Sequence, residues 1–482
     1  MGEPAPLVVA YDVGSVSPAE IAVGVAGLAP VVFLLPRSPH VRTLRPVLAE
    51  LGRVVQLTGS AQRDAVLVRR LAPAGVLTFS ENLLRVTAGL AHALGLPHHT
   101  PEVAEVLTDK YRQRQRLRAA GVDAVACHLV PDAAAWEEAL AAVGLPAVVK
   151  PVQGQGSRGT FAVHDRAEAD SLRSRLFTDP GESWVVEQLL SGQPGGPFGD
   201  YVSVETATDP HGTRVLAVTG KHPLTPPFRE TGQFWPAALA PDHTAAVSDL
   251  AVRAVTALGV TTGICHTEIK LTPHGPRIIE VNGRLGGHLN ELSRRACGVD
   301  LVRTAALLAL GAAPPPAPAP PDRVFFQFNG LAPDSPCHLR TLTGADEIRS
   351  LEGITGYRPY VRPGDHLSGG VGSTFMDLLT GDAPDHSAMV DLLDQALPLL
   401  RYEFTDGATT WTVSPQRARA DDTAQRTPAT TTDKAVEGAG VSPRPDPRQS
   451  LDSSRVQKPS ASGIESAFGS PLLAPDRSPL GK

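Results

Sequence analysis

The sequence predicts a protein of the α/β and α+β class, and three observations lead to this prediction. Short apolar runs alternate with helical segments between residues 7 and 100. Strand-like runs dominate from about residue 146, and a stretch of prolines near residue 316 precedes a further small unit. Because parallel strands need long connections that are usually helical, the first pattern favours a parallel sheet covered by helices.

The N-terminal region supplies the elements of that parallel sheet. Its apolar runs are typical of buried strands, and they read LVVAY, PVVFLL, RVVQL and GVLTF. The segments between them are typical of helices, and they read AEIAVGVAGL, HVRTLRPVLAEL and ENLLRVTAGLAHALGL. We therefore expect one α/β domain over residues 1–103.

The middle of the chain begins with helices and continues with strands. A charged helix, TDKYRQRQRLRAAGV, ends near Gly121 and is followed by AWEEALAAVGL. Five strand-like runs come next: PAVVKP, TFAV, SWVVEQLL, DYVSVETATD and RVLAVTGKH. After the helix HTAAVSDLAVRAVTALGV we expect two more strands, GICHTEIKLT and GPRIIEVN, and a single helix from about Leu289 to Leu310.

Two changes of composition suggest domain boundaries. The run GAAPPPAPAPP cannot continue a helix and is typical of a stiff spacer. After residue 414 the apolar pattern is replaced by Pro, Ser, Thr, Arg and Asp, which predicts disorder. The expected segments are an N-terminal domain (1–103), a central domain (104–312), a proline-rich linker (313–322), a C-terminal α+β domain (323–413) and a disordered tail (414–482).

Composition narrows the class of function. The chain has 482 residues and a net charge of −6, which argues against a nucleic-acid partner because no basic excess neutralises phosphates. Its four cysteines lack CxxC spacing, which is typical of reduced thiols in a cytoplasm. The first residues do not resemble a signal peptide, and the longest apolar stretch is broken by glycines and a proline, so we expect no membrane partner.

A glycine-rich loop, GQGSRG at 154–159, matches the dinucleotide fingerprint letter for letter. A strand rather than a helix is expected to follow it, and Lys150 precedes the glycines, so neither that fingerprint nor a Walker A loop fits. Such a loop between strands can surround a phosphate chain with backbone N–H groups, or be an ordinary hairpin. A buried Lys150 needs an anion, either a nucleotide phosphate or an internal ion pair.

A row of polar side chains follows the strand RIIEVNGRLGG. Strand alternation places Glu280, Asn282 and Arg284 on one face, opposite Ile279. The short connection TPHGPR predicts a hairpin with HTEIK, which brings Glu268 close to Glu280. Carboxylate and amide oxygens suit Mg²⁺ shared with substrate phosphates, and Arg284 could contact a transferring phosphoryl group or a carboxylate.

Seven segments in register resemble the ATP-grasp superfamily, and within it the carboxylate–amine ligases that make amides and dipeptides. They are TDKYRQRQRLRAAGV, AVVKPVQGQGSRG, WVVEQLLSG, YVSVE, PPFRETGQFWP, GICHTEIKLT and RIIEVNGRLGGHL, and they span roughly residues 107–300. The resemblance implies an ATP-grasp fold preceded by a Rossmann-like domain. It also implies a two-step reaction, in which a carboxylate takes the γ-phosphate of ATP and an amine then displaces phosphate from the acyl phosphate.

The resemblance also implies roles for individual residues. Nucleotide binding falls to Lys110, Lys150, Gly154, Gly156, Ser157 and Gly159, and contact with adenine to Glu187, Gln188 and Leu190. The implied ligands of Mg²⁺ (or Mn²⁺) are Glu268, Glu280 and Asn282. The implied catalytic residues are Arg284 and Lys150. Asp200 is a candidate for the ribose, in competition with Tyr201. Arg229, Glu230 and His288 are candidates for substrate contact, with a surface or structural role as the alternative. Gly283 stands where many members have proline, which should loosen the backbone there.

Two other functions fit part of this pattern. One is an enzyme similar to biotin carboxylase that activates bicarbonate, although the chain has no biotinyl-lysine sequence of the A-M-K-M type. The other is a non-catalytic nucleotide-binding subunit, against which the retained lysines, loop and metal positions argue. Many members of the superfamily are homodimers, so a homodimer is one expected assembly.

Overall fold

The computed structural model describes residues 4–177, 181–193, 195–370 and 372–417. Most of the segment expected to be disordered, from residue 418 onward, therefore lies outside the described residues. Residues 414–417 are described, and Arg417 forms an ion pair with Asp394 at 2.9 Å. No helix in the described part of the chain combines the length and the apolar character needed to cross a membrane.

Residues 7–94 form the predicted parallel sheet with helices packed on it. The strand order is β3-β2-β1-β4, with every pair parallel. Its elements are β1 (Leu7–Ala10), α1 (Pro18–Val25), β2 (Val31–Leu35), α2 (Pro39–Leu51), β3 (Arg53–Gln56), α3 (Ala61–Arg69), β4 (Gly75–Thr78), a 3-10 turn η1 (Glu81–Leu83) and α4 (Leu84–Leu94). The order reverses at β1, so the loops after β1 and β4 meet at a topological switch point, where ligand crevices form in such sheets.

A small antiparallel sheet carries the glycine-rich loop. Its strand order is β5-β8-β6-β7, and two helices complete its core. The elements are β5 (Cys127–Val130), η2 (Ala133–Ala135), α7 (Trp136–Val143), β6 (Ala147–Pro151), β7 (Phe161–Val163), α8 (Arg166–Leu176) and β8 (Trp184–Gln188). The loop at 154–159 joins the antiparallel strands β6 and β7, which confirms that a strand follows the glycines.

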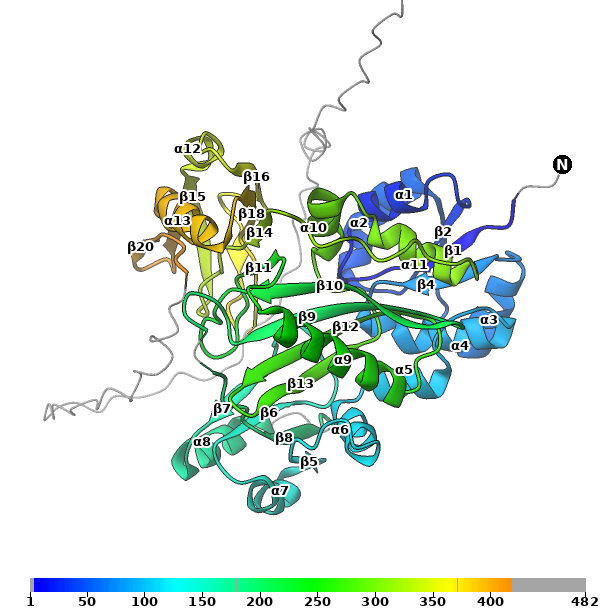
Figure 1. Cartoon of the computed structure of the whole chain (residues 1–482), viewed down its shortest axis with the longest axis horizontal. Helices are drawn as coiled ribbons and strands as arrows, with labels where there is room; N and C mark the ends of the chain where they lie inside the picture. Colours follow the sequence, from blue (N-terminus) through cyan, green and yellow to red (C-terminus); the bar gives the residue numbers. More distant parts are fainter. Residues whose placement is uncertain (1–3, 178–180, 194, 371, 418–482) are drawn as a thin grey trace, which may run out of the picture. The chain divides into compact units, whose positions relative to one another are not determined.

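An eight-stranded antiparallel sheet forms the centre of the molecule, in the order β13-β12-β9-β10-β11-β14-β18-β16. Helix α9 packs across β9, β10, β12 and β13, as Figure 1 shows, and buries their apolar face. The elements are α5 (Pro101–Leu107), α6 (Lys110–Ala119), β9 (Tyr201–Asp209), β10 (Gly212–Lys221), β11 (Gly232–Trp235), α9 (Pro241–Ala257), β12 (Gly263–Thr272), β13 (Gly275–Asn282), α10 (Leu289–Cys297), α11 (Leu301–Ala309), β14 (Val324–Phe328), β16 (Ile354–Pro359) and β18 (Asp377–Ala383).

The C-terminal unit shares that sheet and adds a second one. Strand β14 pairs with β11, so the central sheet continues beyond the proline-rich segment. The second sheet has the order β17-β15-β19-β20. Its elements are β15 (Cys337–Thr343), α12 (Ala345–Arg349), β17 (His366–Leu367), α13 (His386–Ala396), η3 (Leu397–Leu399), β19 (Arg401–Thr405) and β20 (Thr410–Val413).

Two sequence-based expectations about these elements are wrong. The single helix expected from Leu289 to Leu310 is two helices, because Gly298 adopts a left-handed conformation (φ 69°) that ends α10. The expected strand alternation in β13 is also broken. A β-bulge shifts the register after the Glu268–Glu280 pair, so Ile278 is buried beneath α9 while Ile279 lines the same cavity as Glu280.

Candidate nucleotide and substrate site

A cavity of about 450 Å³ gathers most of the residues predicted from the sequence. It is lined by the loop after β1, the glycine-rich loop, the ends of β6 and β8, the β12–β13 hairpin and the segment before β18. The predicted residues that line it are Lys110, Lys150, Gly154, Gly156, Ser157, Glu187, Gln188, Leu190, Glu230, Glu268, Glu280, Asn282, Arg284 and His288. Gly159, Asp200 and Arg229 do not line it.

The paired carboxylates lie where the hairpin was expected to place them. Glu268 and Glu280 are direct partners in the antiparallel β12–β13 pair. Two cations flank them: Lys110 Nζ lies 3.3 Å from Glu280, and His266 Nε2 lies 3.3 Å from Glu268. Although burial alone would raise the pKa of Glu280, Lys110 and Lys150 lower it to about 2. Glu280 therefore presents an ionised carboxylate to the cavity near neutral pH.

The donor set fits Mg²⁺ that is shared with a substrate. The described residues contain no group of three or more His, Cys, Asp or Glu side chains able to hold a metal by themselves. The hairpin instead offers two carboxylates and the amide of Asn282, which donates to Glu280 at 3.0 Å. Hard oxygen donors in this number are typical of Mg²⁺ sites that leave several positions to phosphate oxygens and water.

A buried triad fixes the lysine at the end of β6. Lys150 Nζ lies 2.8 Å from Glu187 Oε2, and Arg114 Nη2 lies 3.0 Å from the same oxygen. Burial raises the pKa of Glu187, but the two cations outweigh it and lower that pKa to about 2. The internal ion pair that the sequence left open for Lys150 is therefore present. It does not remove Lys150 from the cavity wall.

His266 and Glu205 form a second buried pair, which the sequence did not reveal. Glu205 on β9 lies opposite His266, accepts a hydrogen bond from its Nδ1, and accepts another from the backbone N–H of Gly286 at 3.2 Å. Burial lowers the pKa of His266, but Glu205 raises it to about 9, so the ring is cationic at neutral pH. The available signal was the alternation of Ser203 and Glu205 with the apolar residues Val202 and Val204 in the first half of β9.

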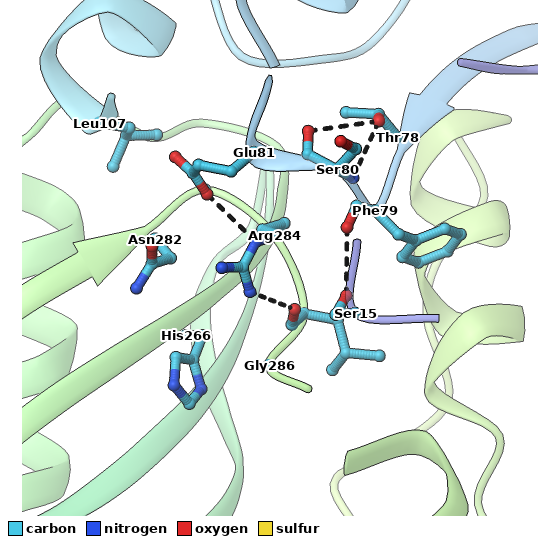
Figure 2. A network of polar contacts seen from close by, with 12 residues as sticks. Ser15, Thr78, Phe79, Ser80, Glu81, Leu107, His266, Asn282, Arg284 and Gly286 are labelled. Atoms are coloured by element: carbon cyan, nitrogen blue, oxygen red, sulfur yellow. Dashed lines mark hydrogen bonds and ion pairs between the residues drawn. The ribbon is translucent and has the colours of Figure 1, made fainter. Parts of the chain in front are cut away.

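Arg284 reaches the cavity from the segment that follows Asn282. Its Nε lies 3.1 Å from Glu81 Oε2, as Figure 2 shows. Its Nη1 donates to the carbonyl of Leu285 at 3.0 Å. Both side chains of the ion pair are largely buried. Burial raises the pKa of Glu81, and the charge of Arg284 opposes that effect.

Comparison with known proteins agrees with this geometry. Residues 143–291, which include the glycine-rich loop and the β12–β13 hairpin, match the family model of the ATP-grasp domain. The chain contains an ATP-grasp domain. A solved L-amino acid ligase from Bacillus licheniformis has the same fold, with a TM-score of 0.67 at 21% identity over 83% of this chain and 99% of that one.

Two curated relatives are ligases. Carnosine synthase 1 from Mus musculus is 33% identical over 272 residues, which are 52% of this chain and 32% of the relative. Alanine–anticapsin ligase from Bacillus subtilis (strain 168) is 25% identical over 44% of this chain and 48% of the relative. The chain thus spans between a third and a half of the length of these relatives.

Residues of the C-terminal unit also line the cavity, among them Gln327, Asn329 and Phe375. The hydroxyl of Tyr201 donates a hydrogen bond to Glu230 at 3.4 Å, and burial raises the pKa of Glu230. His288 adopts a left-handed backbone conformation (φ 59°), with its ring nearly parallel to that of Tyr360. Lys221, at the end of β10, is 4% exposed, lines the cavity and donates to Gln233 at 2.9 Å. Lys221 could not be singled out from the sequence, because it ends a strand as many surface lysines do.

The three predicted residues outside the cavity wall have other contacts. Asp200 pairs with Lys270 at 2.7 Å. Arg229 donates to the backbone carbonyls of Gly372 and Ala332, so it braces loops of the C-terminal unit. Gly159 has a φ of 69°, and a Cβ there would lie 3.1 Å from Pro151. These contacts support the structural alternative for Arg229.

Gly283 is explained by close packing rather than by a loosened backbone. A Cβ at this position would lie 2.7 Å from Leu107 and 2.8 Å from Leu84. Its carbonyl also accepts a hydrogen bond from His99 Nε2 at 2.9 Å. The expectation of a loose backbone is therefore wrong: the absence of a side chain lets the segment before Arg284 pack against α4 and α5.

Proposed function

We propose that this protein is an ATP-dependent carboxylate–amine ligase. It joins an amino acid, or another carboxylic acid, to an amine and releases ADP and phosphate. The observation that carries the proposal is the Glu268–Glu280 pair, which lies in one cavity with Lys110, Lys150 and Arg284. The names of the relatives, carnosine synthase, alanine–anticapsin ligase and L-amino acid ligase, favour amino acids as substrates.

In the first step a carboxylate oxygen of the substrate attacks the γ-phosphorus of ATP. A new P–O bond forms, the bond to ADP breaks, and an acyl phosphate results. This chemistry needs positioning and charge neutralisation more than covalent help from the protein. Lys110, Lys150 and the backbone N–H groups of the glycine-rich loop would hold the phosphates, and Arg284 would contact the transferred group. Mg²⁺ held by Glu268, Glu280 and Asn282 would supply charge neutralisation on the phosphate oxygens.

In the second step an amine attacks the acyl carbon and phosphate leaves. The amine loses a proton as the amide forms, and the phosphate carries away one oxygen of the original carboxylate. Closure of the glycine-rich loop would exclude water, which would otherwise hydrolyse the acyl phosphate. Glu230 and His288 line the same cavity as the carboxylate pair, and we place the two organic substrates beside them.

A substrate screen tests the proposal. The protein is incubated with ATP, Mg²⁺ and pools of amino acids, ADP release is measured, and new amides are sought by mass spectrometry. We expect ADP release that depends on a pool and yields an amide of matching mass. ADP release only with bicarbonate and biotin would identify the carboxylase-type alternative. Tight ATP binding without turnover in any pool would identify a non-catalytic nucleotide-binding subunit.

Two further parts of the proposal concern the setting of the enzyme. We expect a cytoplasmic protein, because its four cysteines lack the spacing of a disulfide framework. We expect its substrates to be small molecules. A homodimer is the assembly to test, by light scattering of the full chain. A monomer would leave the site proposal unchanged, because every residue named above belongs to one chain.

A further inference from the structure

The N-terminal parallel sheet reaches the candidate site through a buried ion pair. Glu81 begins the 3-10 turn that follows β4, and its Oε2 lies 3.1 Å from Nε of Arg284. The two side chains are 9% and 11% exposed. Figure 2 shows Glu81 above Arg284, with Asn282 beside the guanidinium and His266 below it. Every site residue predicted from the sequence lies at or after Lys110, so this contact adds a part of the chain to the site.

The turn that carries Glu81 is clamped by the loop after β1. Ser80 Oγ donates to the carbonyl of Val13 at 2.6 Å, and the N–H of Ser15 donates to the carbonyl of Phe79 at 3.0 Å. A Cβ at Gly14 would lie 2.3 Å from that same carbonyl oxygen, so the two segments touch backbone to backbone. The loop at 13–15 itself lines the cavity. These contacts hold the backbone that carries Glu81 at the topological switch point of the sheet.

We propose that Glu81 is a positioning residue, which holds the guanidinium of Arg284 in the orientation needed for the transferred phosphoryl group. This inference rests on the proposed function. A guanidinium has five N–H donors in a planar fork. Glu81 Oε2 lies 3.1 Å from Nε as an ion pair without hydrogen-bond geometry, and the Leu285 carbonyl accepts a hydrogen bond from Nη1, so the two contacts together favour one orientation of the guanidinium. The remaining N–H donors of the guanidinium are then available to a ligand. Because the guanidinium is already oriented, it loses little orientational freedom when the ligand binds.

The test compares two Glu81 variants with a matched buried ion pair. Glu81→Gln removes the charge and keeps the shape, while Glu81→Asp keeps the charge. Asp123→Asn is the control, because Asp123 pairs with Arg277 at 2.7 Å with a side chain 2% exposed, and neither residue lines the cavity. Two readouts are taken: kcat and KM for ATP with the pool that gives the amide, and the ¹⁵Nε–¹Hε signal of Arg284, identified by its loss in Arg284→Lys.

We expect Glu81→Gln to lower kcat about 10- to 100-fold with KM for ATP unchanged within about twofold. Glu81→Asp should retain more activity than Glu81→Gln. The Arg284 signal should move in Glu81→Gln and stay in place in Asp123→Asn, which should also keep the wild-type kcat. Unchanged kcat in Glu81→Gln, or an equal loss in Asp123→Asn, overturns the inference.

Failure of the proposed function gives a different result. If the wild-type protein releases no ADP with any pool, the ligase proposal fails whatever the variants do. The Arg284 signal then decides the role of Glu81 alone: a signal that moves in Glu81→Gln supports it, and an unmoved signal overturns it.

Discussion

Glu268 and Glu280 face each other as direct partners across the β12–β13 hairpin, at the point where a β-bulge interrupts the register. Like charges directly opposite each other destabilise a sheet unless a cation lies between or beside them. Lys110 and the cationic ring of His266 partly meet this need. Repulsion between the two carboxylates would therefore destabilise a hairpin with a structural role alone. The pairing is explained if the two carboxylates hold a metal that also binds phosphates.

Substitution of one member of this pair should abolish the first chemical step. Glu280→Gln keeps the shape but removes a charged oxygen donor, so ADP formation should fall about 100-fold or more, and the Mg²⁺ concentration needed for half-maximal rate should rise. Glu102→Gln, which breaks an exposed pair with Arg116 away from the cavity, is the control and should keep full activity. Near-normal ADP formation in Glu280→Gln would remove Glu280 from the metal site.

The buried triad around Glu187 makes a prediction about stability and pH. Glu187→Gln leaves Arg114 and Lys150 buried without their counter-charge, so unfolding free energy at neutral pH should fall by about 3–5 kcal/mol. The pKa of Glu187 is lowered to about 2 in the folded protein, so its contribution is complete above about pH 4.3 and is lost as the pH falls toward 2. The difference between wild type and variant should therefore shrink over that window.

Denaturant unfolding at several pH values measures this difference. Glu105→Gln is the matched control, because it breaks an exposed pair with Arg112 and should cost less than about 1 kcal/mol. A constant difference between pH 7 and pH 2 would contradict the assignment of the lowered pKa to Glu187.

Gly283 predicts a contrast between two identical substitutions. Gly283→Ala should destabilise the protein by about 1–3 kcal/mol, because the new methyl group meets the buried ends of Leu107 and Leu84. Gly89→Ala in helix α4 has open space around the new Cβ and should stabilise it by about 0.5–1 kcal/mol. Thermal unfolding compares the two. A neutral Gly283→Ala would show that the leucines move aside freely.

Glu230 should affect the organic substrate rather than ATP. Its half-buried carboxylate lines the same cavity as the paired glutamates, where it can accept hydrogen bonds from an ammonium group. Glu230→Gln should raise KM for one of the two organic substrates about tenfold or more, with KM for ATP unchanged. Steady-state kinetics on the substrates found in the screen measures this. A change confined to KM for ATP would contradict a substrate role.

The sequence was enough to predict the parallel N-terminal sheet and the hairpin that pairs Glu268 with Glu280. Apolar periodicity predicts the parallel sheet, and the short turn with Gly275 predicts the hairpin. Both signals are local in the sequence. The order and identity of the motifs extended this to the glycine-rich loop and the lysines, which line one cavity as expected.

Other features depend on contacts between distant segments and could not be predicted. The bulge that turns Ile279 to the cavity has no signature in the alternation of β13. Glu81 and Glu205 are matched to Arg284 and His266 only through tertiary packing. Helices α3, α5 and α8 are not predicted from the sequence, because each lies between stronger signals. The close packing of Gly283 could not be predicted, because it depends on Leu84 and Leu107, which lie more than 170 residues earlier in the chain.

Transfer of an isotope from carboxylate to phosphate tests the central claim most directly. The acid found in the screen is labelled with ¹⁸O in its carboxylate, and the phosphate released with ADP is analysed by mass spectrometry. Activation through an acyl phosphate predicts one ¹⁸O atom in each phosphate formed with amide product. Phosphate that carries no label, despite amide formation, would contradict the account.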